Sequence, residues 1–368
     1  MKIALAHDHL FQYGGAENIL HEFSQLYPQA PIYTLIHDRQ QQKFFSKQRV
    51  IPSYLQSLPG SRHYFKYLLP LMPNAWERFD FSDFDVVLSS SSAFVKGIIT
   101  SPKTVHISYC HSPTRYLWSD SLRYLQELPL IEPLKSYLYH VLTRLRLWDQ
   151  AAASRVDHFI ANSNYIADRI QKYYRRSSTV IYPPVPTKDF HLSSEQDSFF
   201  LIVSRLRPYK RVDIAIKAFN ALRLPLYIIG TGEELPRLRK LAKANITFLG
   251  ELPDSERNKY LARCQALIHP QEEDFGITAV EAMASGRPVI AYNQGGACES
   301  LINGVTGLFF EEQVWESLAD AVVHFRANQF DPQIIRRHAE TFDSSIFRQK
   351  ITELIENVRK SRYDQISR

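Results

Sequence analysis

Short apolar runs alternate with longer amphipathic stretches along both halves of this chain. Several runs in each half have the length and the Val, Ile, Leu and Phe content typical of buried β-strands. They are KIALAH, PIYTLI, DVVLSSS, TVHISYC and HFIANS in the first half, and FFLIVS, LPLYIIG, ITFLG, ALIHP and PVIAY in the second. Strands that alternate with helical stretches predict parallel sheets flanked by helices. Ligands bind such sheets beyond the carboxyl ends of the strands, so each half offers one candidate edge.

The two halves are separated by the segment YPPVPTKDFHLSSEQDS, residues 182–198. Its three prolines and polar run exclude continued helix or sheet. The length of 368 residues also exceeds the roughly 250–300 residues at which single cores stop growing. We therefore predict an α/β protein with two domains. The expected bounds are 1–182 for the first domain, 183–197 for the linker, 198–333 for the second domain and 334–368 for a C-terminal helical segment. This last segment could close the second domain or cross back to pack on the first, and we expect the crossing.

The strongest candidate site is the segment HPQEEDFGITAVEAMASGRPVIA, residues 269–291. A strand ends in ALIHP, a loop with Glu273 and Gly276 follows, and ITAVEAMASG predicts a helix that Gly286 closes. The start of that helix therefore faces the ligand edge of the sheet. Unpaired amides at a helix start bind anions, and here they are those of Gly276, Ile277 and Thr278. Glu273 lies in the loop and Glu281 one turn into the helix, so one carboxylate can face sugar hydroxyls and the other a ribose.

This segment resembles the E-x-F-G-x-x-x-x-E motif of the retaining glycosyltransferases of family 4. The match covers Glu273, Phe275, Gly276 and Glu281, and the EAM-A-G-P-V pattern that follows strengthens it. The resemblance implies the GT-B fold, in which two Rossmann-like domains face each other across a cleft. Residues 1–182 would then be the acceptor side and residues 198–333 the side that binds the nucleotide sugar. Two glutamates near a helix start could otherwise be plain caps and dipole partners.

A second segment, SRLRPYKR, follows the strand FFLIVS. Cations at a strand-to-helix junction suit a diphosphate, because Arg offers a planar fork and Lys a point charge. The segment is similar to the family's R-L-x-x-x-K pattern, which assigns the donor phosphates to Arg205 and Lys210. It departs from the family at Arg211, where glycine is frequent. The sub-pattern Y-K-R-V-D resembles a branch that includes bacterial surface-polysaccharide and O-antigen mannosyltransferases.

The first half supplies weaker candidates. Gly14 and Gly15 lie in a turn that leads into a helix, and paired glycines let backbone approach a ligand. In the resembling enzymes such a turn lies beside donor phosphate and acceptor. His111 ends the strand TVHISYC, and the resemblance places a histidine there against the transferred sugar, although a lone histidine is more often structural.

Two further motifs match known ligand-binding patterns only in part. Gly230 opens a G-x-G turn after LPLYIIG that lacks the third glycine of a dinucleotide fingerprint, so we interpret it as a loop at the nucleotide edge. Asp83 and Asp85 mimic a D-x-D metal motif, but they precede a strand rather than follow one. No catalytic metal and no cofactor are therefore expected, since the nucleotide sugar is a substrate.

Charge is distributed unevenly along the chain. Residues 1–182 contain 20 Lys and Arg against 14 Asp and Glu, whereas the remainder contains 24 of each, so the net charge of +6 falls in the first half. A basic, aromatic stretch at residues 39–78 has seven Lys and Arg against one acidic residue, so its net charge of +6 equals the excess of residues 1–182. Such a surface fits peripheral attachment to an anionic membrane, and it equally fits a solvated face over a packed apolar one. No signal peptide, spanning segment or nucleic-acid partner is expected. Three scattered cysteines suggest neither disulfides nor zinc, and we expect a cytoplasmic protein, with peripheral membrane contact left open.

These features predict a metal-independent hexosyltransferase, and the family resemblance implies that it retains the configuration of the transferred sugar. The expected donor is GDP-mannose, and the expected acceptor is a glycan or lipid-linked glycan of bacterial polysaccharide biosynthesis. A UDP-sugar donor is the first alternative. A nucleotide-sugar epimerase and a non-catalytic, membrane-associated scaffold are further alternatives, the last of which would have lost Glu273, Arg205 or Lys210.

Overall fold

The computed structural model describes residues 1–11, 14–38, 44–127 and 131–366 and divides the chain into two compact units. Unit 1 comprises Met1–Tyr182 with Phe347–Arg368, and unit 2 comprises Pro183–Ile346. The residues that return to unit 1 thus begin at Phe347, and the sequence before them, from residue 334, lies in unit 2.

Unit 1 contains a parallel sheet in the order β3-β2-β1-β4-β5-β6-β7. Its strands are β1 Ile3–His7, β2 Ile32–Thr34, β3 Val50–Pro52, β4 Val86–Ser91, β5 Val105–Cys110, β6 His158–Ala161 and β7 Ser178–Val180. Its helices are α1 Gly15–Leu26, α2 Met72–Glu77, α3 Ser121–Glu127, α4 Glu132–Ala153 and α5 Asn164–Tyr174, with short turns η2 Tyr54–Ser57, η3 Phe65–Tyr67, η4 Leu69–Leu71 and η5 Val95–Gly97. Strands β1, β4 and β5 are buried at every position, because helices cover both faces of the sheet.

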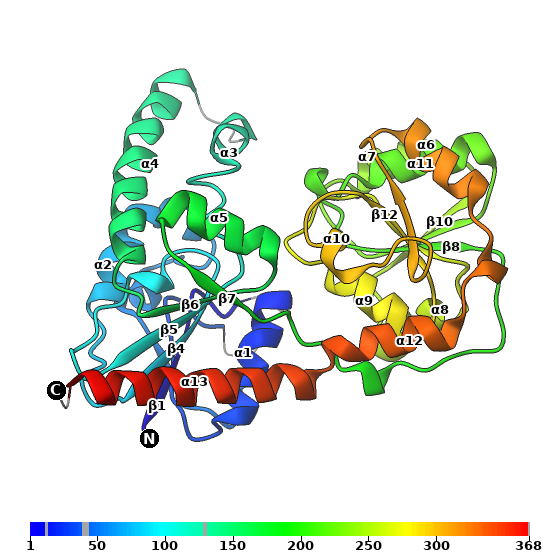
Figure 1. Cartoon of the computed structure of the whole chain (residues 1–368). Coiled ribbons are helices and arrows are strands. Elements are labelled where there is room, and N and C mark those ends of the chain that lie inside the picture. The colour runs from blue at the N-terminus through cyan, green and yellow to red at the C-terminus, as the bar shows by residue number, and fades with distance from the viewer. Residues whose placement is uncertain (12–13, 39–43, 128–130, 367–368) are drawn as a thin grey trace. The chain divides into compact units, whose positions relative to one another are not determined.

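Alternate residues of β1 point into two separate cores. Ile3 and Leu5 pack with α1 and with the C-terminal helix α13 (Ser344–Ile366), whereas Ala4 and Ala6 pack with α2 and α4 (Figure 1). Helix α13 contributes Phe347, Ile351 and Ile355, which are spaced one turn apart and at most 2% exposed. Burying such side chains stabilises by about 1.5–3 kcal/mol each, so α13 is an integral part of unit 1.

Unit 2 repeats this plan with the strand order β10-β9-β8-β11-β12-β13, again all parallel. The strands are β8 Phe200–Val203, β9 Leu226–Ile229, β10 Ile246–Gly250, β11 Leu267–His269, β12 Val289–Tyr292 and β13 Gly307–Phe310. Helices α6 Val212–Leu222, α7 Leu235–Leu241 and α11 Trp315–His324 group together, as do α8 Asp254–Arg263, α9 Ile277–Ala284 and α12 Pro332–Ala339 (Figure 1). The short elements are α10 Ala297–Ser300, η6 Thr187–Asp189, η7 Pro208–Lys210, η8 Ala327–Gln329 and η9 Glu340–Phe342.

All the strands predicted from apolar runs are confirmed. Strands β3, β7 and β13 were not predicted, and each lies at an edge of its sheet. In both sheets the strand order reverses direction beside the first strand, between β1 and β4 in unit 1 and between β8 and β11 in unit 2. Loops diverge at such a switch point and leave room for a ligand at the carboxyl edge.

Candidate active site

The loops after β8 and β11 meet at the switch point of unit 2. Lys210 ends η7 on the first loop and Glu273 lies on the second, and their side chains form an ion pair. The two side chains are 15% and 18% exposed, so they are shielded from most of the solvent but remain accessible to a ligand. The pair brings together the two residues that the sequence assigned to phosphate and to sugar.

The backbone of Glu273 is fixed by a glycine pair that the sequence analysis did not single out. The Gly296 amide donates to the Glu273 carbonyl at 2.8 Å. Gly295 has φ 73°, and a Cβ there would lie 2.5 Å from the same carbonyl oxygen. Only glycine allows this approach. The available signal was a Gly-Gly pair just after β12, at the ligand edge of the sheet.

Helix α9 begins next to this pair. Gly276, its N-cap residue, has φ 88° and carries no side chain to cap the first-turn amides of Ile277 and Thr278. The preceding Phe275 is buried against Phe342, which anchors the loop. Glu281 lies within α9, 3.6 Å from the Arg257 guanidinium. Burial raises the pKa of Glu281, and the charge of Arg257 opposes that rise.

Backbone contacts also join the loops after β8, β9 and β10. Gly230 has φ 128° and donates its amide to the Gly250 carbonyl at 2.7 Å. A Cβ at Gly230 would lie 1.9 Å from the Ser204 carbonyl oxygen, beside the exposed Arg205. Arg211, where the resembling family often has glycine, has φ 50°. The left-handed backbone explains that preference.

In unit 1, His111 follows β5 and is linked to the start of α1. Ser90 Oγ lies 2.8 Å from His111 Nε2 and 3.3 Å from the Ala16 carbonyl oxygen, directly after Gly14 and Gly15. Burial, followed by the nearby His7, lowers the pKa of His111 to about 3, so the ring is neutral near pH 7. His7 and Glu17 also pair at 3.6 Å. Burial works to raise the pKa of Glu17, but the hydrogen bond and charge of His7 outweigh it and lower that pKa.

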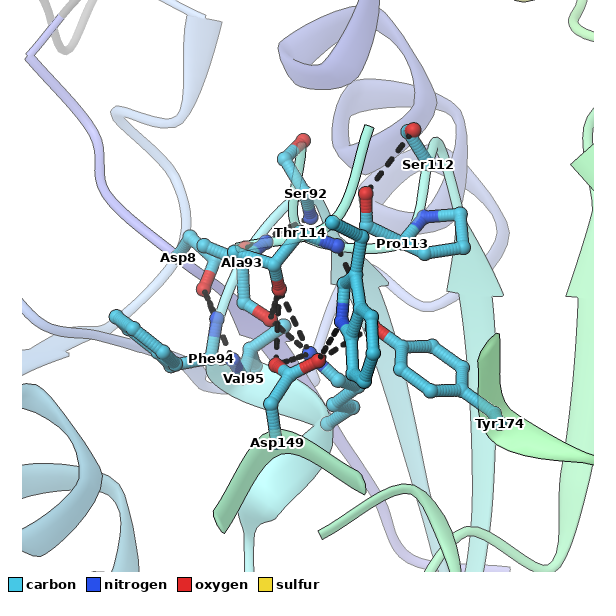
Figure 2. A network of polar contacts seen from close by, with 12 residues as sticks. Asp8, Ser92, Ala93, Phe94, Val95, Ser112, Pro113, Thr114, Asp149 and Tyr174 are labelled. Carbon is cyan, nitrogen blue, oxygen red and sulfur yellow. Dashed lines mark hydrogen bonds and ion pairs between the residues drawn. The ribbon is translucent and has the colours of Figure 1, made fainter. Parts of the chain in front are cut away.

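Asp8 fills the switch point of unit 1. Its carboxylate accepts four backbone amides, those of Ser92 and Ala93 at 2.7 Å and those of Phe94 and Val95 at 2.8 Å (Figure 2). The side chain therefore ties the loop after β1 to the loop after β4. Nothing in the sequence pattern around Asp8 predicted this role.

A second buried carboxylate, Asp149 of α4, holds the neighbouring loops (Figure 2). It pairs with Lys96 at 2.5 Å, and both side chains are at most 1% exposed. Thr114 Oγ1, Trp118 Nε1 and Tyr174 OH donate to it at 2.8–2.9 Å. The network fixes the loop after β4 and the loop after β5, the second of which begins at His111. No local sequence pattern predicted it.

Asp83 and Asp85 lie before β4, as predicted. The Asp85 carboxylate accepts the Lys2 amide at 2.7 Å, which supports its interpretation as the start of a strand. Among the described residues no group of three or more His, Cys, Asp or Glu side chains could hold a metal ion. Likewise, no helix in the described part of the chain is long and apolar enough to cross a membrane.

The basic stretch at residues 39–78 is partly core. Its first five residues, 39–43, lie outside the described part of the chain. Its buried side chains include Phe45, Leu55, Leu69 and Trp76. Its exposed ones include Phe44, Tyr64, Tyr67 and Leu71, which are 43–65% exposed. The buried side chains therefore fit a solvated face over a packed apolar one, and the exposed aromatic side chains fit peripheral membrane attachment.

Comparison with known proteins identifies the family. The profile described as "Glycosyltransferase Family 4" matches residues 13–189, and that of "Glycosyl transferases group 1" matches residues 186–341. An O-antigen chain mannosyltransferase, RfbU of Salmonella typhimurium, is 29% identical over 52% of this chain and 59% of its own. The α-1,3/1,6-mannosyltransferase ALG2 of Dictyostelium discoideum is 24% identical over 60% of this chain and 62% of its own.

The chain spans about half to three-fifths of the length of these curated relatives. Among solved structures, Anabaena HepE in complex with UDP superposes with a TM-score of 0.72 and 18% identity, covering 97% of this chain and all of that one. Sucrose-phosphate synthase from Thermosynechococcus elongatus superposes with a TM-score of 0.75 at 15% identity, covering 98% of this chain and all of that one. The two profiles and the shared architecture agree: the chain belongs to the family 4 glycosyltransferases and has the GT-B fold of two Rossmann-like units.

Proposed function

We propose that this chain transfers a hexose from a nucleotide sugar to a glycan or lipid-linked glycan, with retention of configuration at the transferred carbon. The observation that carries the proposal is the Lys210–Glu273 ion pair at the switch point of unit 2, beside the first turn of α9. A cation, a carboxylate and a row of helix-start amides together suit a diphosphate attached to a polyhydroxylated sugar.

The proposal assigns roles to the candidate residues of unit 2. Arg205, Lys210 and the amides at the start of α9 neutralise the charge that develops on the departing diphosphate. A single preorganised donor of this kind contributes roughly 3–4 kcal/mol to transition-state stabilisation. Glu273 accepts hydrogen bonds from the hydroxyls of the transferred sugar, and Lys210 orients its carboxylate. Glu281 accepts hydrogen bonds from the ribose.

The chemical step needs no protein nucleophile and no metal in this scheme. The bond between the anomeric carbon and the diphosphate oxygen breaks, and its electron pair leaves with the diphosphate. The acceptor hydroxyl forms the new bond on the same face of the sugar, and its proton passes to an oxygen of the departing diphosphate. We propose that His111, neutral near pH 7 because burial lowers its pKa to about 3, hydrogen-bonds the sugar rather than exchanging protons.

We propose mannose and GDP as the transferred sugar and nucleotide, because several curated relatives are named mannosyltransferases. A UDP-sugar is the second candidate, since HepE structures contain UDP with glucose and UDP-glucose. A thermal-shift panel of nucleoside diphosphates separates the two. A ligand at a hundredfold excess over its Kd stabilises by about 2.7 kcal/mol, so the cognate base will stand out. If no nucleoside diphosphate stabilises the chain, the proposed function is refuted.

We further propose that the acceptor is presented at a membrane and that residues 39–78 contact anionic lipid. The support is the positive excess of residues 1–182 together with exposed aromatic side chains at Tyr64 and Tyr67. Each Lys or Arg near such a surface contributes on the order of 1 kcal/mol, screened over roughly 8–10 Å.

Sedimentation with anionic liposomes at low and high salt tests this contact, with the wild type compared against a variant in which Lys43, Lys47, Arg62 and Lys66 are changed to Gln. The wild type should sediment with the liposomes at low salt, and the variant should not. Equal binding by both proteins would instead favour a solvated face and a soluble acceptor.

A further inference from the structure

His269 is a buried histidine of the site to which none of the roles above refers. It is the last residue of β11 and is 2% exposed. Its Nδ1 atom lies 3.2 Å from Gln271 Nε2. Its Nε2 atom is also buried, and it has no hydrogen-bond partner among the described residues. This side of the ring faces the start of α9, because a Cβ at Gly276 would lie 3.3 Å from Nε2.

The neighbouring side chains define which ring nitrogen carries the proton. Gln271 Nε2 also lies 3.4 Å from Glu273 Oε1, so the amide group of Gln271 turns its NH₂ toward the carboxylate. An amide nitrogen can only donate, and His269 Nδ1 must therefore accept. Burial lowers the pKa of His269 to about 4, which keeps the ring neutral near pH 7. A neutral ring whose Nδ1 accepts carries its single proton on Nε2.

A buried N–H group without an acceptor costs roughly 1–3 kcal/mol, so its presence needs an explanation. The Nε2–H group of His269 faces the amides that the proposed function assigns to the donor. Resting on that function, we propose that His269 is a further donor-binding residue whose Nε2–H group hydrogen-bonds an oxygen of the nucleotide sugar. Glu273 sets its tautomer through Gln271, so the residue that serves the sugar also prepares this second contact.

Gly276 has a left-handed backbone that favours glycine, and the absence of a side chain there also fits the proposed role of His269. A side chain there would stand between Nε2 and the start of α9, since its Cβ alone would come within 3.3 Å.

The oxygen that accepts the hydrogen bond from Nε2–H can belong to the diphosphate or to the sugar. Binding of GDP tests the first source, and the added affinity of GDP-mannose tests the second; UDP and UDP-glucose are titrated in parallel to cover the other base.

The first test is nitrogen NMR of the whole chain with ¹⁵N-labelled histidine, in which the signals of His269 are assigned by their loss in His269→Phe. We expect the Nε2–H tautomer near pH 7, and a change in the Nε2 signal when the nucleotide is added. A proton on Nδ1 would overturn the inference whether or not any nucleotide binds.

The second test is calorimetric titration of three variants. His269→Phe removes the donor and should weaken binding about 10- to 100-fold, the range expected for a hydrogen bond to a charged oxygen. His269→Gln can place an amide N–H near the Nε2 position and should retain most of the affinity. His106→Phe is the matched control, because His106 is an equally buried neutral histidine in unit 1, and it should bind as the wild type does.

The outcomes separate the two proposals. If the wild type binds nucleotide and His269→Phe binds it with the same Kd, the role of His269 is wrong and the proposed function stands. If His269→Gln loses as much affinity as His269→Phe, the ring acts through packing and the inference also fails. If the wild type binds neither GDP nor UDP, the proposed function fails first.

Discussion

Removing the Asp149 carboxylate should destabilise unit 1 more than removing its partner Lys96. In Asp149→Ala the buried ammonium of Lys96 keeps only neutral partners among the described residues: the Thr114 hydroxyl, the Ala93 carbonyl and the Tyr174 ring. In Lys96→Met the carboxylate keeps three hydrogen-bond donors. Leaving one member of a buried pair without its counter-charge costs about 3–5 kcal/mol. We expect the free energy of unfolding to fall by nearly that amount in Asp149→Ala and by clearly less in Lys96→Met.

Urea unfolding followed by tryptophan fluorescence measures the difference. Three of the four tryptophans, at positions 76, 118 and 148, lie in unit 1, and Trp118 donates directly to Asp149. For a loss of about 4 kcal/mol and an m-value of about 2 kcal/mol per molar urea, the midpoint falls by about 2 M. The double variant Lys96→Met/Asp149→Leu should be more stable than Asp149→Ala, because it leaves no buried charge unpaired. Equal losses in the two single variants, or a larger loss in Lys96→Met, would refute this reasoning.

Three further predictions concern the site and its acid sensitivity. Arg205→Ala and Lys210→Ala should each weaken nucleoside diphosphate binding far more than nucleoside binding, and calorimetry showing equal losses would reject their assignment to phosphates. Transfer should survive excess EDTA, whereas a rate that returns only with Mn²⁺ or Mg²⁺ would show that Asp83 and Asp85 were misinterpreted. The melting temperature should fall as the pH drops below about 6.5, because burial lowers the folded-state pKa values of four imidazoles. Below that pH the unfolded chain binds protons that the folded chain does not. The stability present above pH 6.5 is therefore lost toward pH 3–4, at up to about 1.4 kcal/mol per pH unit for each ring. A melting temperature that stays constant down to pH 4.5 would contradict this. These imidazoles belong to His9, His106, His111 and His269.

The sequence predicted the parts of this fold whose signal is local. Buried parallel strands are continuous apolar runs, and the segment from Glu273 to Gly286 combines a strand end, a helix start and a closing glycine within a few residues. Edge strands such as β3 and β13 escaped prediction because they are three and four residues long and only partly buried.

The contacts missed by the sequence analysis join residues that are far apart along the chain. Asp8 accepts amides that lie 84–87 residues away, and those amides belong to the backbone, so no side-chain pattern could have marked them. Lys96 and Asp149 are charged residues of the kind that normally lies on a surface. Their burial depends on how α4 packs against the loops after β4 and β5, and local periodicity does not report such packing.

The role of Glu273 is the central claim, and a comparison of Glu273→Gln with Glu272→Gln tests it most directly. The neighbouring Glu272 is exposed and offers the same change in charge one residue away. The measurement is the initial rate of sugar transfer at saturating donor, with the nucleotide that the thermal-shift panel selects, together with the Kd of the nucleoside diphosphate. We predict that Glu273→Gln lowers turnover by about 100-fold or more while the folded chain still binds the nucleoside diphosphate, and that Glu272→Gln behaves as the wild type. Wild-type turnover in Glu273→Gln would contradict the account.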